Sequence, residues 1–318
     1  MRTISVRAHG KVNLHLGVGD AREDGYHELV TVFQSLSLSD VVTLEIDDDE
    51  TVATGSIVSG LTATGLDAAS VPQDATNLAW RGVDTLVDFY RARHGLGSLP
   101  RVRIRIEKGI PTAGGMAGGS ADAAAALLAA HILVTETMPA LDQTTLDALA
   151  AELGSDVPFT LRGGTMLGTG RGEQLTPMLS RGRYHWALVF SKQGLATPEV
   201  FGHLDQLRDQ GREIGPSLDT TDLAHALMTG NAEEVAGHLA NDLQAPAVSL
   251  RSDIARTLDL GKRAGALAGI VSGSGPTCAF LCRSELHARD VLDDLLSEGV
   301  YSGATATGPA HGAHLIDG

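Results

Sequence analysis

A glycine-rich segment at residues 111–130 limits most strongly what this chain can fold into. It reads PTAGGMAGGSADAAAALLAA, with four glycines inside six residues, followed by a serine and an alanine-rich run. Glycine allows backbone conformations that other residues rarely adopt, whereas alanine is the strongest helix former. The segment therefore predicts a tight loop that leads directly into a closely packed helix.

The residues before this loop predict a strand. Residues 101–110, RVRIRIEKGI, alternate arginine with valine or isoleucine, which is the period of a half-buried strand. After the glycines, Ser120 is a suitable N-cap, and Asp122 would fall in the first helical turn. A strand, a glycine loop and a helix N-terminus together place backbone N–H groups around an anion, and phosphate is the usual one.

Two known phosphate-binding loops fit this segment poorly. Residues 114–119 have the glycine spacing of a Walker A loop, but Ser120 and Ala121 stand where lysine and serine or threonine should follow. A dinucleotide-binding fingerprint counted from Gly115 has Ala117 in place of its second glycine, which argues against a dinucleotide oxidoreductase. On this segment alone, an ordinary glycine turn before a packed alanine helix also remains open.

Length and charge restrict the classes of partner. The chain has 318 residues, enough for one large domain or two of ordinary size. Its net charge of −15 comes from 24 basic and 39 acidic side chains, so we expect no nucleic-acid partner. Cys278 and Cys282 share one face of a predicted strand and fit buried thiols in a reducing compartment. The twelve histidines are scattered, so we expect no metal ion held by the protein itself.

No targeting or membrane segment is expected. The first residues, MRTISVRAHGKVNLHL, are polar from the start, unlike a secretory signal peptide. The longest apolar stretch, residues 123–134, contains His131 and is too short to cross a bilayer. We therefore expect a soluble, cytoplasmic protein without a membrane partner.

Helix and strand signals are mixed along the chain without regular β-α-β repetition. Asn77 is a candidate N-cap for an amphipathic helix that follows it, a second helix is expected at residues 144–153, and residues 163–175 predict a hairpin. Further helices are expected at residues 198–210, 221–228, 231–243 and 285–297. The pattern predicts an α+β fold with two domains, residues 1–175 and 176–318.

Three further sites carry residues that are typical of chemistry. Lys11 begins an alternating strand with Asn13 on the same polar face, and Asp156 lies in LGSDVPF after a helix end. Residues 272–280, SGSGPTCAF, form a second loop of small residues before a strand. Taken singly, each has an ordinary explanation as a surface lysine, a turn aspartate or a tight turn. Two glycine loops so far apart in sequence nevertheless suggest backbone closing on one bound molecule from two sides.

These motifs resemble, in their order, those of the GHMP kinase superfamily, named for galactokinase, homoserine kinase, mevalonate kinase and phosphomevalonate kinase. The resemblance is carried by GKVNLHLGV, DGYHELVTVFQSLSLSD, IPTAGGMAGGSADAAAAL, LGSDVPF, NDLQAP and SGSGPTCAF, which run across nearly the whole chain. It implies a two-domain GHMP-kinase-like fold with the active site in the inter-domain cleft. DGYHEL and GSDVPF are similar to the branch whose acceptor is a cytidine-diphosphate-linked methylerythritol, in the non-mevalonate route to isoprenoid precursors.

The resemblance also implies roles for particular residues. Asp156 would be the general base that accepts the proton of the acceptor hydroxyl, and Lys11 would be its charge partner. The ATP-binding residues would be Asn77, Lys108, Gly109, Pro111, Gly114, Gly115, Met116, Ala117, Gly118, Gly119 and Ser120. The acceptor-binding residues would be Asn13, Tyr26, His27, Thr197 and Phe201, with the two larger rings on either side of the cytosine.

The implied cofactor is ATP with Mg²⁺. Relatives often carry two serines after the loop glycines, but here the pair is Ser120-Ala121, so Mg²⁺ would be bound mainly through phosphates and water. Two alternatives remain: a kinase of the superfamily acting on homoserine or a mevalonate derivative, and a nucleotide-binding protein without turnover. The presence of both Lys11 and Asp156 argues against the second. A weak homodimer is compatible with the sequence.

Overall fold

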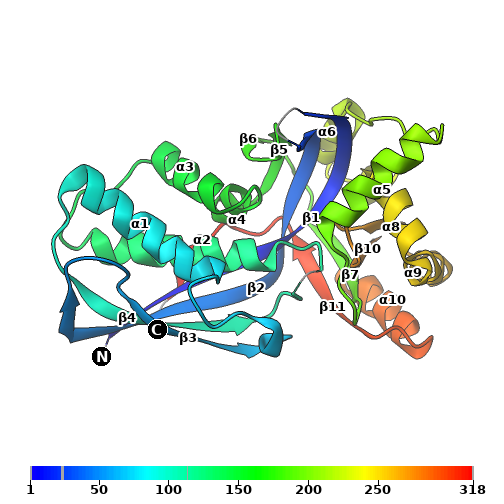
Figure 1. Cartoon of the computed structure of the whole chain (residues 1–318). Coiled ribbons are helices and arrows are strands. Elements are labelled where there is room, and N and C mark those ends of the chain that lie inside the picture. Colours follow the sequence, from blue (N-terminus) through cyan, green and yellow to red (C-terminus); the bar gives the residue numbers. More distant parts are fainter. Residues whose placement is uncertain (1, 23–24, 113, 317–318) are drawn as a thin grey trace.

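The computed structural model describes residues 2–22, 25–112 and 114–316, which form two β-sheets with helices packed against each (Figure 1). The α+β fold class is confirmed. The strands are β1 (Arg2–Ala21), β2 (His27–Val52), β3 (Val58–Gly65), β4 (Leu99–Lys108), β5 (Thr165–Thr169), β6 (Gln174–Pro177), β7 (Tyr184–Phe190), β8 (Ala240–Asn241), β9 (Ala268–Val271), β10 (Cys278–Cys282), β11 (Ser302–Gly308) and β12 (His314–Ile316).

The helices are unevenly distributed between the two halves of the chain. The helices are α1 (Leu78–His94), α2 (Gly118–Val134), α3 (Gln143–Leu153), α4 (Val157–Arg162), α5 (Thr197–Asp209), α6 (Thr221–Thr229), α7 (Ala232–Ala236), α8 (Gln244–Leu250), α9 (Ser252–Arg263) and α10 (Glu285–Ser297), with a short 3-10 helix at Ala68–Ser70. No helix in the described ranges has both the length and the apolar character needed to cross a membrane.

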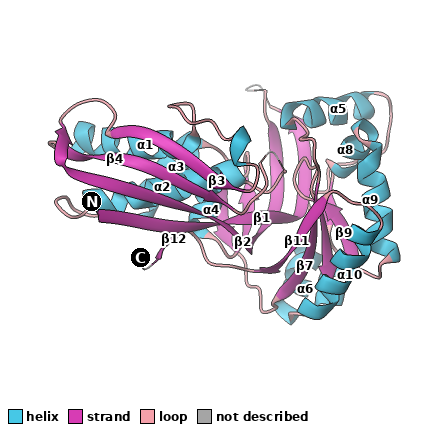
Figure 2. Ribbon diagram, turned by 90° about the horizontal axis from the view of Figure 1, so that it is seen from below, coloured by secondary structure: helices cyan, strands magenta, loops and turns pink. Residues whose placement is uncertain are grey.

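The larger sheet has the strand order β12-β1-β2-β4-β3, with β5 beside β2, β6 beside β5, and β8 beside β1. Helices α1, α2, α3 and α4 cover one of its faces (Figure 2). In β4, Val102, Ile104 and Ile106 are almost completely buried, while the arginines between them lie at the other face. The alternation at residues 101–110 thus corresponds to a strand that buries one side against the helices.

The smaller sheet, of order β11-β7-β10-β9, is antiparallel throughout its described pairs. Its core includes Trp186 on β7 and Phe280 on β10, both fully buried. Cys278 and Cys282 on β10 are buried free thiols, and burial raises the pKa of Cys278 to about 12 and that of Cys282 to about 11. Both cysteines are therefore unreactive packing residues, in agreement with the sequence-based prediction.

The second half of the chain returns twice to the larger sheet. β12 pairs with β1 in antiparallel register, with Ser5 opposite Ile316, and β8 runs parallel to β1 where His15 lies opposite Ala240. The β8 pairing brings the second half of the chain to the part of β1 that follows the polar residues Lys11 and Asn13, whereas β12 pairs near the beginning of the strand. The predicted division at residue 175 falls within β6, and it stays a prediction.

Most of the expected elements are present, with some local differences. Residues 231–243 do not form one helix, because α7 ends at Ala236 and the chain then extends into β8 to pair with β1. Pairing with a neighbouring strand outweighs the helical periodicity here. Helices α4 and α8 were not predicted, although Pro158 in the first turn of α4 is a signal for a helix start.

The close approach of α1 to α2 depends on a glycine. A Cβ at Gly82 would lie 2.8 Å from the carbonyl oxygen of Ala123, so alanine at this position forces the helices apart. We expect Gly82→Ala to lower the free energy of unfolding by about 1–3 kcal/mol, although alanine is the better helix former. Urea unfolding measures the change.

Gly202, inside α5, is the matched control, because no atom lies within 4 Å of a Cβ added there. Gly202→Ala should raise the free energy of unfolding by roughly 0.5–1 kcal/mol through helix propensity alone. Equal effects of the two substitutions would show that α1 and α2 are not in this close contact.

Candidate active site

A cavity of about 820 Å³ lies where the larger sheet meets the second half of the chain. Its wall is formed by β1, the start of β2, the glycine loop, the first turn of α2, the loop before α4, the first turns of α5 and the second glycine loop. The predicted site residues that line it are Lys11, Asn13, Tyr26, His27, Gly114, Gly115, Ala117, Gly118, Gly119, Ser120, Asp156, Thr197 and Phe201.

Lys11 and Asp156 meet in this cavity, although they are far apart in sequence. The Lys11 Nζ atom lies 3.7 Å from Asp156 Oδ2, and the side chains are 5% and 32% exposed respectively. The lysine is thus nearly enclosed, while the carboxylate remains accessible from the cavity. An ammonium and a carboxylate at this separation attract each other without a direct hydrogen bond that would occupy the carboxylate.

A chain of buried hydrogen bonds holds Lys11 in this position. Its Nζ donates to Asn13 Oδ1 at 2.6 Å, and Asn13 Nδ2 donates to Thr31 Oγ1 at 2.8 Å. The Thr31 hydroxyl in turn donates to the carbonyl oxygen of His15 at 2.7 Å. The ring of Phe33 lies 5.6 Å from the ammonium and adds a cation–π contact. Four neighbouring positions on β1 and β2 therefore restrict one side chain.

The glycine loop leads into α2 differently from the sequence-based prediction. The helix begins at Gly118 and its N-cap is Ala117, so Ser120 is not the cap, and Asp122 lies beyond the first turn. Ala117 adopts the left-handed conformation, with φ of 60°, which is unfavourable for a residue with a Cβ. Within the described residues, no side chain caps this helix, so the amides of its first turn, whose residues line the cavity, stay available as hydrogen-bond donors.

The two glycine loops touch each other through their backbones. A Cβ at Gly115 would overlap the carbonyl oxygen of Ser272, and one at Gly114 would lie 2.8 Å from Thr277 Oγ1. The Ser272 hydroxyl donates to the carbonyl oxygen of Gly115 at 3.0 Å. Gly273, on the second loop, lines the same cavity as the first loop. Backbone from both loops therefore borders one space.

The other end of the cavity is aromatic. The rings of His27 and Phe201 have their centroids 5.1 Å apart, and His27 Nε2 lies 2.9 Å from Asp205 Oδ1. Tyr26 is 53% exposed, and the Arg171 guanidinium lies 5.1 Å from the centroid of its ring. An exposed ring that borders a cavity offers a face for stacking on a planar group. Asp24, the first residue of the DGYHEL motif, lies outside the described residues.

Five predicted residues do not line the cavity: Asn77, Lys108, Gly109, Pro111 and Met116. Asn77 caps α1 by accepting from the amide of Ala79, and its Nδ2 donates to the carbonyl oxygen of Pro72. Met116 is fully buried, and its carbonyl oxygen accepts from the Lys11 amide at 3.1 Å. For these five residues, a contact with nucleotide stays a prediction.

Lys108 belongs to a buried ionic cluster beneath the glycine loop. Its Nζ donates to Asp40 and, at 2.7 Å, to Asp122 Oδ2, while Asp40 Oδ1 accepts from the amides of Gly109 and Ile110. Burial raises the pKa of Asp122 well above its usual range, and Asp40 adds to this, although Lys108 opposes it. Burial alone would lower the pKa of Lys108, but the two carboxylates raise it overall.

Several cavity residues were missed by sequence reasoning. Arg171 follows β5 in the hairpin, Asp205 lies on α5, and Ser274 belongs to the second loop, where its hydroxyl lies 2.8 Å from Thr197 Oγ1. The SGSGP motif was a usable signal for Ser274. Arg171 and Asp205 carried none, because a single charged residue in a turn or on an exposed helix face is ordinary.

The fold and this site define a class of protein. Amides at an uncapped helix start and a buried lysine beside an accessible aspartate are features that suit phosphoryl transfer to a small molecule. Family models agree: "GHMP kinases N terminal domain" matches residues 77–164, and "GHMP kinases C terminal" matches residues 223–301. The chain belongs to the GHMP kinases, enzymes that transfer a phosphoryl group from ATP to a small molecule.

Comparison with individual proteins shows which members of the family this chain is similar to. A Corynebacterium diphtheriae protein named 4-diphosphocytidyl-2-C-methyl-D-erythritol kinase is 56% identical, over 98% of this chain and 97% of its own length. A crystal structure of 4-(cytidine 5'-diphospho)-2C-methyl-D-erythritol kinase superposes with a TM-score of 0.73 and 31% identity, covering 96% of this chain and 99% of that one. A homoserine kinase from Cytophaga hutchinsonii gives a TM-score of 0.71 at 17% identity over 99% and 98% of the two chains, which shows the shared fold alone.

The ionic cluster makes stability depend on pH through Asp122. Its folded pKa is raised above the unfolded value of about 4, so the folded state keeps a proton that the unfolded state loses. The contribution of Asp122 to the free energy of unfolding should therefore fall as pH rises from about 4 toward that folded pKa. Asp122→Asn removes this fall, by about 1.4 kcal/mol for each pKa unit of the shift.

Urea unfolding between pH 4 and pH 8 measures this effect. Lys108 does not interfere, because a raised lysine pKa changes stability only above about pH 10. Asp88→Asn, whose side chain is 72% exposed on α1, is the control and should keep the parental slope. Parallel pH profiles for Asp122→Asn and the parent would refute the assignment.

Proposed function

We propose that the chain phosphorylates the 2-hydroxyl of 4-diphosphocytidyl-2-C-methyl-D-erythritol with ATP, in the non-mevalonate route to isoprenoid precursors. The observation that carries the proposal is the meeting of Lys11 and Asp156 in one cavity, with uncapped helix amides at one end and aromatic rings at the other. The names of relatives that match nearly the full chain support this acceptor.

Asp156 acts as the general base in this proposal. The acceptor hydroxyl must lose its proton as its oxygen attacks the γ-phosphorus, and an accessible carboxylate can accept that proton. The Lys11 ammonium lies 3.7 Å from this carboxylate and offsets negative charge on the phosphoryl oxygens. Because Asn13 holds the ammonium by a hydrogen bond, the lysine need not reorganise during the reaction.

The phosphates of ATP bind at the start of α2. Amides of Gly118, Gly119 and Ser120 precede the first helical hydrogen bond, which runs from Ala121 to Ala117, so they can donate to phosphate oxygens. The helix dipole adds positive potential at the same point. This matters because the chain as a whole carries a charge of −15, which repels a polyanion.

The donor set fits a metal ion carried mainly by the nucleotide. Among the described residues, no three histidine, cysteine, aspartate or glutamate side chains come together as a metal site. Near the phosphate end, Ser120, Ser155 and Asp156 line the cavity, and their side-chain oxygens could add to phosphate and water ligands. Mg²⁺ held in this way would neutralise phosphate charge as the phosphoryl group is transferred.

The cytidine end of the acceptor lies among Tyr26, His27 and Phe201. Tyr26 presents an exposed ring for stacking on the pyrimidine, and the polar edge of His27 is oriented by Asp205. Arg171 beside Tyr26 supplies a positive charge where the diphosphate of the acceptor must pass.

Two other functions are tested by one assay. A kinase for homoserine or a mevalonate derivative would share this fold, and a non-catalytic nucleotide binder would share the loops. We expect ADP release with Mg-ATP and the cytidylyl acceptor, and little with homoserine, mevalonate or galactose. If another compound of that panel had a higher kcat/KM than the cytidylyl acceptor, it would replace the proposed acceptor. If no compound were phosphorylated, a non-catalytic nucleotide-binding protein would be favoured.

Asp156→Asn should fold, bind ATP with parental affinity and lose about 10²–10⁴-fold in kcat, because an amide cannot accept the proton. Steady-state ADP release and nucleotide titration measure the two properties. Glu152→Gln, an exposed change on α3, is the matched control and should leave both unchanged. Parental turnover of Asp156→Asn would remove the general-base role.

Tyr26→Ala should raise KM for the cytidylyl acceptor by about tenfold or more and leave KM for ATP unchanged, because an aromatic stack contributes roughly 1–3 kcal/mol. Tyr26→Phe keeps the ring and should retain most of the acceptor affinity. An unchanged acceptor KM in Tyr26→Ala would place the cytosine elsewhere.

A further inference from the structure

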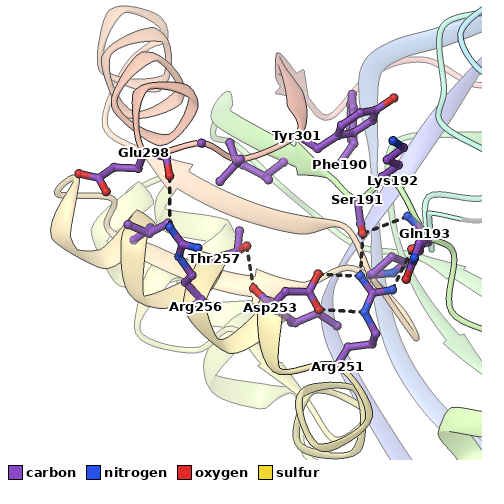
Figure 3. Close-up of a pocket in the computed structure, with 16 residues that line it drawn as sticks. Phe190, Ser191, Lys192, Gln193, Arg251, Asp253, Arg256, Thr257, Glu298 and Tyr301 are labelled. Carbon is purple, nitrogen blue, oxygen red and sulfur yellow. Dashed lines mark hydrogen bonds and ion pairs between the residues drawn. The ribbon is translucent and has the colours of Figure 1, made fainter.

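A second cavity, of about 430 Å³, lies in the second half of the chain and has no part in the proposed reaction (Figure 3). It is bordered by the end of β7 and the residues that follow it, by the first two turns of α9, and by the segment between α10 and β11. Its volume lies in the range of pockets that hold small organic molecules.

Two cationic side chains on its wall are not neutralised by carboxylates. Within the described residues, Lys192 has no hydrogen-bond or ion-pair partner. Among the residues that the structure describes, Arg256 donates only to the backbone carbonyl of Glu298, at 3.4 Å, and Figure 3 shows the Glu298 carboxylate pointing away from it. The cavity therefore keeps a positive surplus in a chain whose net charge is −15.

A third cation in the wall is neutralised and fixed. The Arg251 guanidinium forms two bonds with the Asp253 carboxylate, at 2.8 and 2.6 Å, and also donates to Ser191 Oγ and the carbonyl oxygen of Gln193. This network holds the residues after β7 against the start of α9, as the dashed lines in Figure 3 show. The floor of the cavity is thus built before any ligand enters.

The remaining wall is apolar and partly aromatic. Phe190, Ile254 and Leu260 are buried beneath it, and Tyr301 stands at its edge with 61% of its surface exposed. Figure 3 shows the Tyr301 ring beside Phe190 and Lys192, across the cavity from the start of α9. An exposed aromatic ring next to an unpaired ammonium is suited to a ligand that combines a flat apolar body with a negative group.

We propose that this cavity binds a small organic anion, a phosphate or carboxylate group on an aromatic or other flat apolar body. Lys192 binds the anionic group beside Tyr301, the body stacks on the Tyr301 ring over the apolar floor, and Arg256 adds positive charge from the other side of the cavity. The site is separate from the cavity that holds Lys11 and Asp156, so the proposal stands whether or not the chain phosphorylates the proposed acceptor.

The position of the cavity relates it to the second glycine loop. Pro276 lines this cavity, while Gly273 and Ser274, two and three positions earlier, line the larger one. A ligand here therefore contacts the reverse side of a loop that borders the candidate active site.

Calorimetric titration of the full chain tests the site, with saturating Mg-ADP added to occupy the larger cavity. The probes are phenyl phosphate, benzoate, inorganic phosphate and benzyl alcohol. We expect phenyl phosphate or benzoate to bind at least about tenfold more tightly than inorganic phosphate, which lacks the ring, and than benzyl alcohol, which lacks the charge. The tighter of the two aromatic anions identifies the preferred acid group.

Substitutions locate the binding. Lys192→Ala with Arg256→Ala, and separately Tyr301→Ala, should each weaken the tighter probe by about tenfold or more. Lys262→Ala, an exposed lysine on α9 outside the cavity, is the control and should bind as the parent does. The altered side chains are all exposed, and unchanged melting temperatures verify folding. Binding that survives both changes, or aromatic anions that bind no better than benzyl alcohol, would overturn the proposal.

Discussion

The backbone contact between the two glycine loops is the constraint on which the candidate active site depends. Gly115 lies so close to the carbonyl of Ser272 that no side chain fits between them, and the Ser272 hydroxyl bonds back to Gly115. Asn241 fixes the second loop by donating to the carbonyl oxygens of Val271 and Gly273 at 2.8 and 2.7 Å. Because β8, which contains Asn241, pairs with β1, the same contacts set the distance between the second loop and Lys11. The spacing of the cavity walls is therefore determined by main chain, which moves less than side chains.

Local electrostatics must work against the charge of the whole molecule. A chain of net charge −15 repels a nucleoside triphosphate at long range, so binding depends on a few concentrated sources of positive potential. The uncapped first turn of α2 and the enclosed Lys11 are two such sources, and both lie at the same end of the cavity. Enclosure strengthens the field of Lys11, because fewer waters screen it than would screen a surface lysine. The left-handed Ala117 directs the amides that follow it, which is a reason for the chain to tolerate a strained residue there.

Patterns of local origin were predictable from the sequence, and long-range partners were not. The alternation of arginine with valine or isoleucine predicted β4, and Asn77 as an N-cap predicted the start of α1. The glycine spacing indicated an anion-binding loop. The N-cap of α2 was placed three residues late, at Ser120, because propensity favours serine over an alanine that tertiary contacts hold in the left-handed region. The cluster of Lys108, Asp40 and Asp122 joins residues 68 and 14 positions apart, and no periodicity reports such a meeting. The resemblance implied that Lys108 contacts the nucleotide. Because its ammonium binds the two carboxylates of the cluster, the side chain of Lys108 points into the protein interior beneath the loop.

The second glycine loop has a role on both of its sides. Gly273 and Ser274 border the candidate active site, Pro276 borders the smaller cavity, and the loop is only as long as a tight turn, with Ser272 N bonded to Thr277 O. This hydrogen bond links the two ends of the turn, so a displacement on one side would be transmitted to the other. An anion in the smaller cavity that favours one position of the turn would change the affinity of the larger cavity for nucleotide or acceptor. By linkage, nucleotide or acceptor would then change the affinity of the smaller cavity for the anion by the same factor. The two cavities would not be coupled if the turn kept one position in every ligand state. The hydrogen bonds of Asn241 and Ser272 would have this effect if they held the turn rigidly.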